Sequence, residues 1–271
     1  MRFKRRIIQL STAIIYNCNL SGFFTGRIYK GKIKGVCTPG LNCYSCPGAV
    51  AACPLGSLQG AVAKSRYRFP FYVLGLLLLF GIVFGRGVCG FLCPFGLIQE
   101  LIYKIPTPKI KKNMVTGKLS YLKYLILVLF VVLIPIIAVE PGFCKYICPA
   151  GTLEAGLPLF FLDKGIRRAL GLLFSWKVMV LVSVLLICIL FFRGFCRFLC
   201  PLGAIYSFFN HMSFFGVEVE HGKCSGCGAC KECCGMDISR VGDRECIQCM
   251  ECIDVCPEQA IKCRTFFDEK Q

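Results

Sequence analysis

The spacing of its cysteines constrains this chain more than any other feature. Of the 271 residues 22 are cysteine, and most stand in C-x2-C, C-x3-C or Cys-Pro steps. A small secreted protein can carry many disulfides, but it would not also carry long apolar stretches. Spacings of this kind are typical of metal ligands. They predict metal sites in a reducing, anaerobic cell.

The rest of the composition is that of a membrane protein. The chain is 56% apolar and 17% charged, against about 45–50% and about 25% in soluble domains. Its net charge of +17 lies mainly in short basic runs beside apolar stretches, which suits anionic lipid headgroups better than nucleic acid. We therefore expect lipid as a partner and no nucleic acid. No small-residue cleavage site follows the basic N-terminus, which predicts a retained anchor.

Apolar stretches and an internal repeat predict the fold. Four membrane spans are expected, at residues 7–24, 69–84, 121–139 and 176–192, since about 20 residues cross a bilayer core. The block Arg-Gly-Val-Cys-Gly-Phe-Leu-Cys-Pro ending at Pro94 recurs as Arg-Gly-Phe-Cys-Arg-Phe-Leu-Cys-Pro ending at Pro201, and further Cys-Pro-x-Gly steps begin at Cys53 and Cys148. The pattern predicts two tandem halves of like orientation, whose matching loops meet across a pseudo-two-fold axis.

The fold class expected is therefore an α-helical membrane protein of about four transmembrane helices over residues 1–212. A small α+β ferredoxin domain, of the bacterial type with two [4Fe-4S] clusters, is expected over residues 213–271. Clusters are assembled in the cytoplasm, so we expect this domain there and the rest in the cytoplasmic (inner) membrane as a multi-pass protein. Four spans would then place the N-terminus in the cytoplasm too. The basic loop at residues 25–69 would lie outside, against the positive-inside rule.

Two runs near the C-terminus fit C-x2-C-x2-C-x3-C. In such pairs three cysteines of one run bind a cluster with the fourth cysteine of the other run. One cluster is expected on Cys224, Cys227, Cys230 and Cys256, and the other on Cys246, Cys249, Cys252 and Cys234. Zinc sites are the alternative, but zinc does not require two interleaved runs. Gly235 stands where proline is usual after the first run.

Each Cys-x3-Cys-Pro motif of the membrane part supplies only two thiols, and a cubane needs four. The likeness of two motifs makes Cys89, Cys93, Cys196 and Cys200 the expected set, on the cytoplasmic side. Proline suits the first position of a helix, so the preceding cysteine would lie at its N-terminus, where free amides and the helix dipole favour an anion. Reduced thiols or a redox disulfide are the alternative.

Six cysteines are expected on the opposite side of the membrane. They are Cys37, Cys43, Cys46, Cys53, Cys144 and Cys148. Either the first four hold a cluster alone, or Cys144 and Cys148 join two of them, and a loop disulfide among the others is a further alternative. One or two clusters are thus expected in the membrane part, beside two in the C-terminal domain.

Other cofactors find little support in the sequence. Only two histidines occur and no C-x-x-C-H motif, which excludes c-type haem. Neither a Walker loop nor a G-x-G-x-x-G after a strand is present. The aromatic-rich stretches at Phe191, Phe192, Phe208 and Phe209 favour contact with lipid over a quinone pocket, although a quinone remains a possible cofactor.

Over residues 70–262 the order of spans, Cys-x3-Cys-Pro motifs and two-cluster ferredoxin resembles the membrane polyferredoxins. That family includes the quinol dehydrogenase subunit of periplasmic nitrate reductase systems and the ferredoxin part of the nitrous oxide reductase regulator. The cysteine-rich segment at residues 37–59 departs from the nitrate-reductase subunits and looks like a subgroup of 4Fe-4S membrane proteins from anaerobes. The resemblance implies electron transfer across the membrane, with any flavin on a partner protein.

Our leading functional hypothesis is a membrane-bound electron carrier between a cytoplasmic or quinone donor and an extracytoplasmic acceptor. The expected partners are a soluble electron carrier and an extracytoplasmic flavoprotein or reductase subunit. Because a core of about 30 Å is too thick for a direct hop, intermediate cofactors are required. The alternatives are a quinol dehydrogenase subunit and a copper-handling, metal-reducing or regulatory thiol protein.

Overall fold

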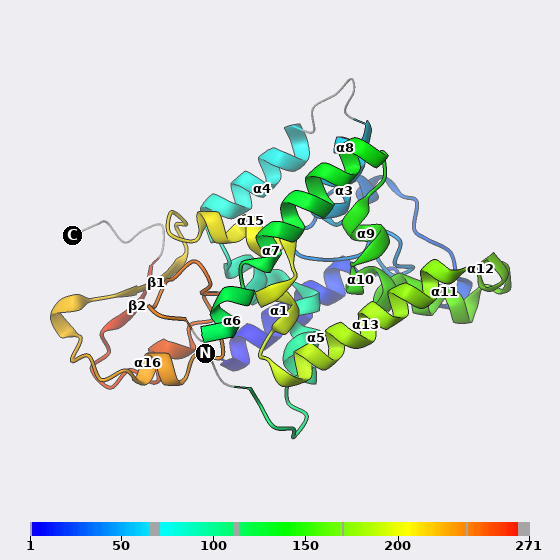
Figure 1. The fold of residues 1–271 in the computed structure, drawn as a ribbon. Coiled ribbons are helices and arrows are strands. Elements are labelled where there is room, and N and C mark those ends of the chain that lie inside the picture. Colours follow the sequence, from blue (N-terminus) through cyan, green and yellow to red (C-terminus); the bar gives the residue numbers. More distant parts are fainter. Residues whose placement is uncertain (1, 65–70, 111–113, 170, 237, 265–271) are drawn as a thin grey trace.

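The computed structural model describes residues 2–64, 71–110, 114–169, 171–236 and 238–264. It is helical as far as residue 209, and the two described strands lie in the C-terminal part. Three long helical stretches run in roughly the same direction, and the C-terminal domain lies at one end of them (Figure 1). These stretches are α4 (Phe71–Phe84), α13 (Leu172–Leu190), and a run made of α6 (Met114–Leu119), α7 (Leu122–Ile126), a π-helical turn (Leu127–Leu133) and α8 (Ile134–Ala138).

Two of the described helical stretches are long and apolar enough to cross a membrane. They are Thr116–Ala138 and Leu172–Leu190, with mean hydropathies of 2.6 and 2.5. Only 22% and 17% of their residues are buried, whereas the core helix of a soluble protein would bury its apolar surface. This outward-facing apolar surface supports association with a membrane. Helix α4 is apolar throughout but has only 14 residues, fewer than the about 20 that cross a bilayer core unaided.

The N-terminal stretch differs from the single span expected at residues 7–24. Helix α1 (Arg2–Tyr16) ends early, and α2 (Ser21–Thr25) is separate. The break has a polar cause, because the Asn19 side chain donates to the carbonyl oxygen of Pro47 at 2.8 Å instead of continuing the helix. Helix α1 also buries polar side chains and exposes apolar ones. Arg5 and Gln9 are buried, while Ile14 and Ile15 are more than half exposed.

Each of the four Cys-Pro-x-Gly steps begins a helix, as expected from the preference of proline for the first helical position. Cys53 precedes α3 (Pro54–Lys64), and Cys93 precedes α5 (Pro94–Ile102). Cys148 precedes α10 (Pro149–Gly151), and Cys200 precedes α15 (Pro201–Phe209). The remaining helices are α9 (Gly142–Tyr146), α11 (Leu157–Leu162), α12 (Lys164–Ala169) and α14 (Gly194–Phe198), with π-helical turns at Val88–Leu92 and Thr152–Gly156 and a 3-10 turn at Lys32–Gly35.

In the C-terminal domain, strands β1 (Gly216–Val219) and β2 (Ile261–Arg264) pair antiparallel. Between them lie a 3-10 turn (His221–Lys223) and two short helices, α16 (Ala229–Glu232) and α17 (Glu251–Asp254). Each of the two short helices lies within one cysteine run, and the paired strands bracket both runs in one small unit. The described part of this domain thus has the strand and helix content of the α+β unit expected from the sequence.

The C-terminal domain docks on the end of the helical part that carries Cys89. The Asn210 side chain donates to the carbonyl oxygens of Asp243 and Cys246 at 2.6 and 3.0 Å. Gly90 lies so close to the Ile247 carbonyl that an added Cβ would be 2.3 Å from its oxygen. The second repeat has Arg197 at the position of Gly90, so this close approach of a glycine to Ile247 is made by the first repeat.

Candidate iron-sulfur sites

Four cysteines of the two repeats come together in the protein interior. Cys196 interacts electrostatically with Cys89, Cys93 and Cys200, and all four side chains are at most 5% exposed. We call them the repeat set. The first and second repeats each contribute two of its thiols, so the matching loops meet as the repeat predicted. Four buried thiols that share one interior are the donor set that a cubane requires.

At two of the Cys-Pro-x-Gly steps a backbone amide donates to the sulfur of the step's own cysteine. Gly203 N–H donates to Cys200 Sγ, and Gly151 N–H donates to Cys148 Sγ, at 3.4 Å in both cases. At Cys93 the Gly96 N–H instead donates to the carbonyl oxygen of Cys93, at 3.1 Å. A free amide of the first helical turn carries partial positive charge and favours a thiolate over a thiol.

Two buried arginines cross from one repeat to the other. Arg86 Nη2 donates to the carbonyl oxygen of Cys196 at 3.3 Å, and Arg193 Nη1 donates to the carbonyl oxygen of Cys89. Both arginines are fully buried, and each stands three residues before the first cysteine of its repeat. The exchange is reciprocal, as a pseudo-two-fold relation between the repeats requires.

Carboxylates neutralise both arginines. Glu245 contacts Arg86 Nη1 at 2.5 Å and Lys123 Nζ at 2.6 Å, while Glu100 contacts Arg193 at 2.5 Å and Arg5 at 2.7 Å. Burial would raise the pKa of Glu245, but the nearby Arg86 and Lys123 cations outweigh it and hold that pKa below its ordinary value. A buried cation without such a partner would be strongly destabilising.

Sequence reasoning did not single out these charged residues. The sequence does contain a pattern that points to the two arginines, because both belong to the repeated block. The identity of their partners was not accessible, since Glu100 lies in α5 and Glu245 in the distant C-terminal domain.

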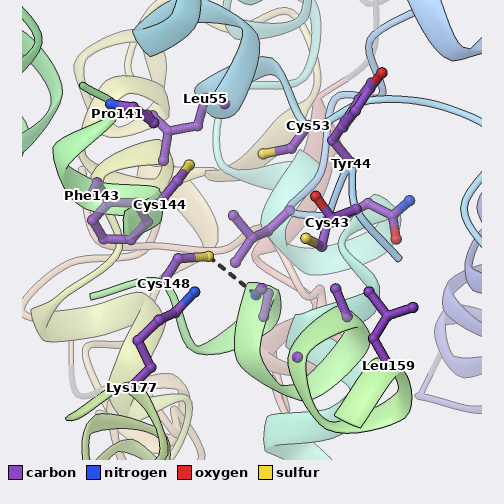
Figure 2. Close-up of a pocket in the computed structure, with 18 of the residues that line it drawn as sticks. Cys43, Tyr44, Cys53, Leu55, Pro141, Phe143, Cys144, Cys148, Leu159 and Lys177 are labelled. Carbon is purple, nitrogen blue, oxygen red and sulfur yellow. Dashed lines mark hydrogen bonds between the residues drawn. The ribbon is translucent and has the colours of Figure 1, made fainter. Parts of the chain in front are cut away.

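A second group of four thiols lines a cavity of about 950 Å³. The side chains come from the loop at residues 37–53, from α9 and from the residue before α10, and Figure 2 shows them around one space. Each interacts electrostatically with at least one other member. We call this group the cavity set; its members are Cys43, Cys53, Cys144 and Cys148.

The two other loop cysteines lie elsewhere. Cys37 Sγ is 3.3 Å from the hydroxyl oxygen of Ser57, and Cys46 lies beside Lys34 and receives backbone bonds from Gly48 and Ala49. Neither residue lines the cavity. The geometry thus favours the alternative in which Cys144 and Cys148 join two thiols of the loop.

Glutamines hold one thiol of each set in the same way. Gln99 Nε2 donates to Cys196 Sγ at 3.0 Å, and Gln59 Nε2 donates to Cys144 Sγ at 3.2 Å. Each glutamine is buried and lies five residues after the proline of a Cys-Pro step. The repeat set and the cavity set therefore share one local arrangement, in which a glutamine that follows a Cys-Pro step donates to a cysteine sulfur. The glutamines were also missed from the sequence, because their common offset is visible only once the two sets are known.

In the C-terminal domain, one expected ligand set comes together clearly. Cys252 interacts with Cys246, Cys249 and Cys234, which we call the second ferredoxin set. The first ferredoxin set is Cys224, Cys227, Cys230 and Cys256. Two of its members, Cys224 and Cys227, are exposed.

The two cysteine runs repeat one backbone conformation. Gly226 and Gly228 have positive φ in the first run, and Gln248 and Met250 have it at the matching places in the second. Left-handed backbone is costly for residues other than glycine. At Gln248 the side chain offsets part of that cost, because its Oε1 accepts from Val217 N–H at 2.9 Å and its Nε2 donates to Asn210 at 3.1 Å.

The donor sets suit a cluster better than a single ion. Among the described residues no three His, Cys, Asp or Glu side chains converge on one metal ion. A cubane instead takes one thiolate at each of four irons, so its ligands surround a larger object. Two of the remaining cysteines, Cys18 and Cys188, lie outside all four sets. Cys188 is fully buried in α13, where cysteine commonly acts as a small apolar side chain.

Comparison with known proteins agrees with this chemistry. A family described as "4Fe-4S binding domain" matches residues 66–113, 123–162 and 172–216, and a second family with the same description matches residues 241–262. The matched segments contain the repeat set and the second cysteine run. No solved structure matches the chain significantly.

Two uncharacterized proteins of Methanocaldococcus jannaschii, MJ0749 and MJ0750, are each 28% identical, over 72% and 77% of this chain and 70% and 84% of their own lengths. The putative electron transport protein YccM of Escherichia coli is 28% identical over 69% of this chain and 51% of its own length. Other relatives are named as ferredoxin-type proteins NapH and MauN and as the regulatory protein NosR. With its 4Fe-4S domains and these relatives, the chain belongs to the polyferredoxin family of iron-sulfur electron-transport proteins.

Proposed function

We propose that this chain conducts single electrons through a membrane, between its ferredoxin domain and an acceptor at the far end of the helical part. The observation that carries the proposal is a continuous series of contacts through three thiol sets. Arg86 contacts both Glu245, next to Cys246, and the carbonyl oxygen of Cys196. Gly40, three residues before Cys43, packs against the carbonyl oxygen of Leu92 and the Cα of Cys93.

In this proposal each of the four sets binds one [4Fe-4S] cluster. The two ferredoxin sets, the repeat set and the cavity set each provide four thiolates, and a bound cluster supplies a one-electron redox centre. The protein excludes water from the repeat set and provides amide, glutamine and arginine hydrogen bonds around it. Hydrogen bonds to cluster sulfurs and burial are the means by which a protein sets the reduction potential.

The contacts between the two membrane thiol sets also revise the separation that we expected between them. The sequence led us to expect thiol clusters at opposite faces of the membrane, with an additional cofactor between them. The loop at residues 37–53 instead reaches the repeat set, since Gly40 packs against the Leu92 carbonyl. Under this proposal no quinone or partner cofactor is required between the two membrane sets.

The proposed arrangement has the ferredoxin domain and the N-terminus on the cytoplasmic side of the inner membrane. Arg5 Nη2 lies 2.9 Å from Glu251 Oε1, which supports a common side for the two termini. A soluble carrier would exchange electrons at the exposed Cys224 and Cys227. An extracytoplasmic flavoprotein or reductase subunit would exchange electrons at the cavity set, where Tyr44 is 54% exposed. Any flavin would belong to that partner.

Vesicles test this function directly. The full chain, loaded with iron anaerobically, is reconstituted into liposomes that contain ferricyanide, and dithionite is added outside. We expect bleaching of the trapped ferricyanide with the full chain and its loss with Cys144→Ser. Equal rates for the full chain and that variant would contradict the conduit. Cys18→Ser is the matched control, because Cys18 is exposed and lies outside the four sets.

A second candidate function is quinone oxidation or reduction, favoured by one cavity. A space of about 630 Å³ opens between α1, the first repeat and the ferredoxin domain. Its walls include the rings of Phe84, Phe91 and Phe215, with Arg5 and Cys249 of the second ferredoxin set. Reduction of added menaquinone by the purified chain, abolished by Phe91→Trp, would favour this function. Inactivity of the native chain would remove it.

A further inference from the structure

One short segment contacts both membrane thiol sets. Residues 39 and 40 lie on the repeat set: the Pro39 carbonyl oxygen accepts a 2.9 Å hydrogen bond from the Tyr206 hydroxyl, and Gly40 packs against the Leu92 carbonyl oxygen and the Cα of Cys93. The next three residues lie at the cavity set. Leu41 and Asn42 line the cavity, and Cys43 is itself a member of that set. Consecutive residues of one backbone segment therefore contact the two sets.

We propose that residues 39–43 are the coupling segment that carries electron exchange between the repeat set and the cavity set, with Gly40 and Tyr206 as its positioning residues. This inference rests on the proposed function, because both sets must hold clusters. One electron leaves the repeat set, which is oxidised by one, and enters the cavity set, which is reduced by one. No bond forms or breaks, and no proton is transferred.

Backbone dimensions explain why this segment gives a short path. Successive Cα atoms are about 3.8 Å apart across a trans peptide, so the Leu41 and Asn42 amides are separated by a single residue step. The backbone from Gly40, which packs on Cys93, to Cys43 of the cavity set therefore covers only three residue steps. Leu41 and Asn42 are at most 2% exposed, which excludes water from that connection.

Gly40 is required for the close approach. A Cβ at this position would lie 2.7 Å from the Leu92 carbonyl oxygen and 3.0 Å from the Cα of Cys93. Both are backbone atoms next to a cluster ligand, so they cannot move aside as a flexible side chain could. Substitution of Gly40 should therefore lift the segment off the repeat set.

Tyr206 holds the segment from the opposite direction. Its side chain is fully buried in α15, and it interacts electrostatically with Cys89 and Cys93 of the repeat set and with Cys53 of the cavity set. The residue thus lies between the two sets, and its hydroxyl is directed at the segment. Tyr206→Phe removes the bond to Pro39 and keeps the ring that fills the interior.

Magnetic coupling between the two sets tests the inference. The full chain is reduced anaerobically, its iron and sulfide are measured, and EPR spectra are recorded on native protein, Gly40→Ala and Tyr206→Phe. We expect a spin-coupled signal in native protein that narrows in both variants at unchanged iron content. Gly75→Ala is the matched control, because no heavy atom lies within 4 Å of its added Cβ, and its spectrum should equal the native one.

The outcomes separate this inference from the proposed function. Native protein with clusters at both membrane sets but no coupled signal would overturn the role of the segment. That role is also overturned if Tyr206→Phe and Gly40→Ala both keep the native coupling with full iron. Native protein without iron at the membrane sets would instead overturn the proposed function. If Gly40→Ala loses iron, Tyr206→Phe still tests whether the segment couples the two sets. This variant removes only one oxygen atom from the interior.

Discussion

Arg86 of the first repeat donates to the carbonyl oxygen of Cys196 of the second repeat at 3.3 Å, and the equivalent Arg193 returns the contact to Cys89. Each arginine thus joins a loop of one repeat to a thiol residue of the other. Their charges are balanced by Glu245 and Glu100. The repeat set is therefore enclosed by two related ion-pair networks, and both reach the ferredoxin domain, one at Glu245 and the other at Glu251 through Arg5.

Glu245→Gln should destabilise the protein strongly. The change leaves Arg86 and Lys123, both fully buried, without the carboxylate that they share. Removing one partner from a buried ion pair costs about 3–5 kcal/mol. We expect the midpoint of thermal unfolding in detergent to fall accordingly. Glu258→Gln, at an exposed position of the same domain, should leave the midpoint unchanged, and an equal fall in both variants would count against the network.

Gly90→Ala should separate the ferredoxin domain from the helical part. The added Cβ would lie 2.3 Å from the Ile247 carbonyl oxygen, a backbone atom of the second cysteine run. We expect faster proteolysis between residues 209 and 216, with the iron of the C-terminal domain retained. Gly75→Ala adds a Cβ with no heavy atom within 4 Å and should behave as the native chain. Native proteolysis of Gly90→Ala would show that the docking does not depend on this contact.

The sequence predicted the chemistry of the sites better than their placement. The repeat around Cys89 and Cys196 was sufficient to pair the two loops, because similar loops in tandem halves are expected to be related by symmetry. The choice between Cys43 and Cys46 was not accessible, since it depends on how the loop folds over the repeat set. The helix predicted at residues 7–24 ends at Tyr16 because Asn19 bonds a distant loop carbonyl, a tertiary contact that hydropathy does not contain.

Gln99→Leu and Gln59→Leu should each lower the reduction potential of one membrane cluster. Each glutamine donates a hydrogen bond to a thiol sulfur, and such bonds stabilise the more negative, reduced state of a cluster. In a redox titration followed by EPR, Gln99→Leu should shift one signal and Gln59→Leu a different one. The two variants serve as controls for each other. A shift of the same signal by both variants would disprove the assignment to separate sets.

Cys43→Ser and Cys46→Ser should differ in iron content. Cys43 lines the cavity beside the thiols of α9 and of the residue before α10, whereas Cys46 does not. We expect Cys43→Ser to lose one cluster's share of iron and sulfide and Cys46→Ser to keep the native amounts. The opposite result would mean that the loop supplies a different pair of ligands to the cavity set.

The central claim is that thiols of the helical part bind clusters in addition to those of the ferredoxin domain. Anaerobic iron and labile-sulfide analysis with EPR tests it most directly, on the full chain and on a variant with Cys89, Cys93, Cys196 and Cys200 all changed to Ser. Four sets predict about four cubanes in the full chain, one per set of four thiolates, and one fewer in the variant. If both proteins hold only the two ferredoxin clusters, the membrane cysteines are thiols and the account is wrong.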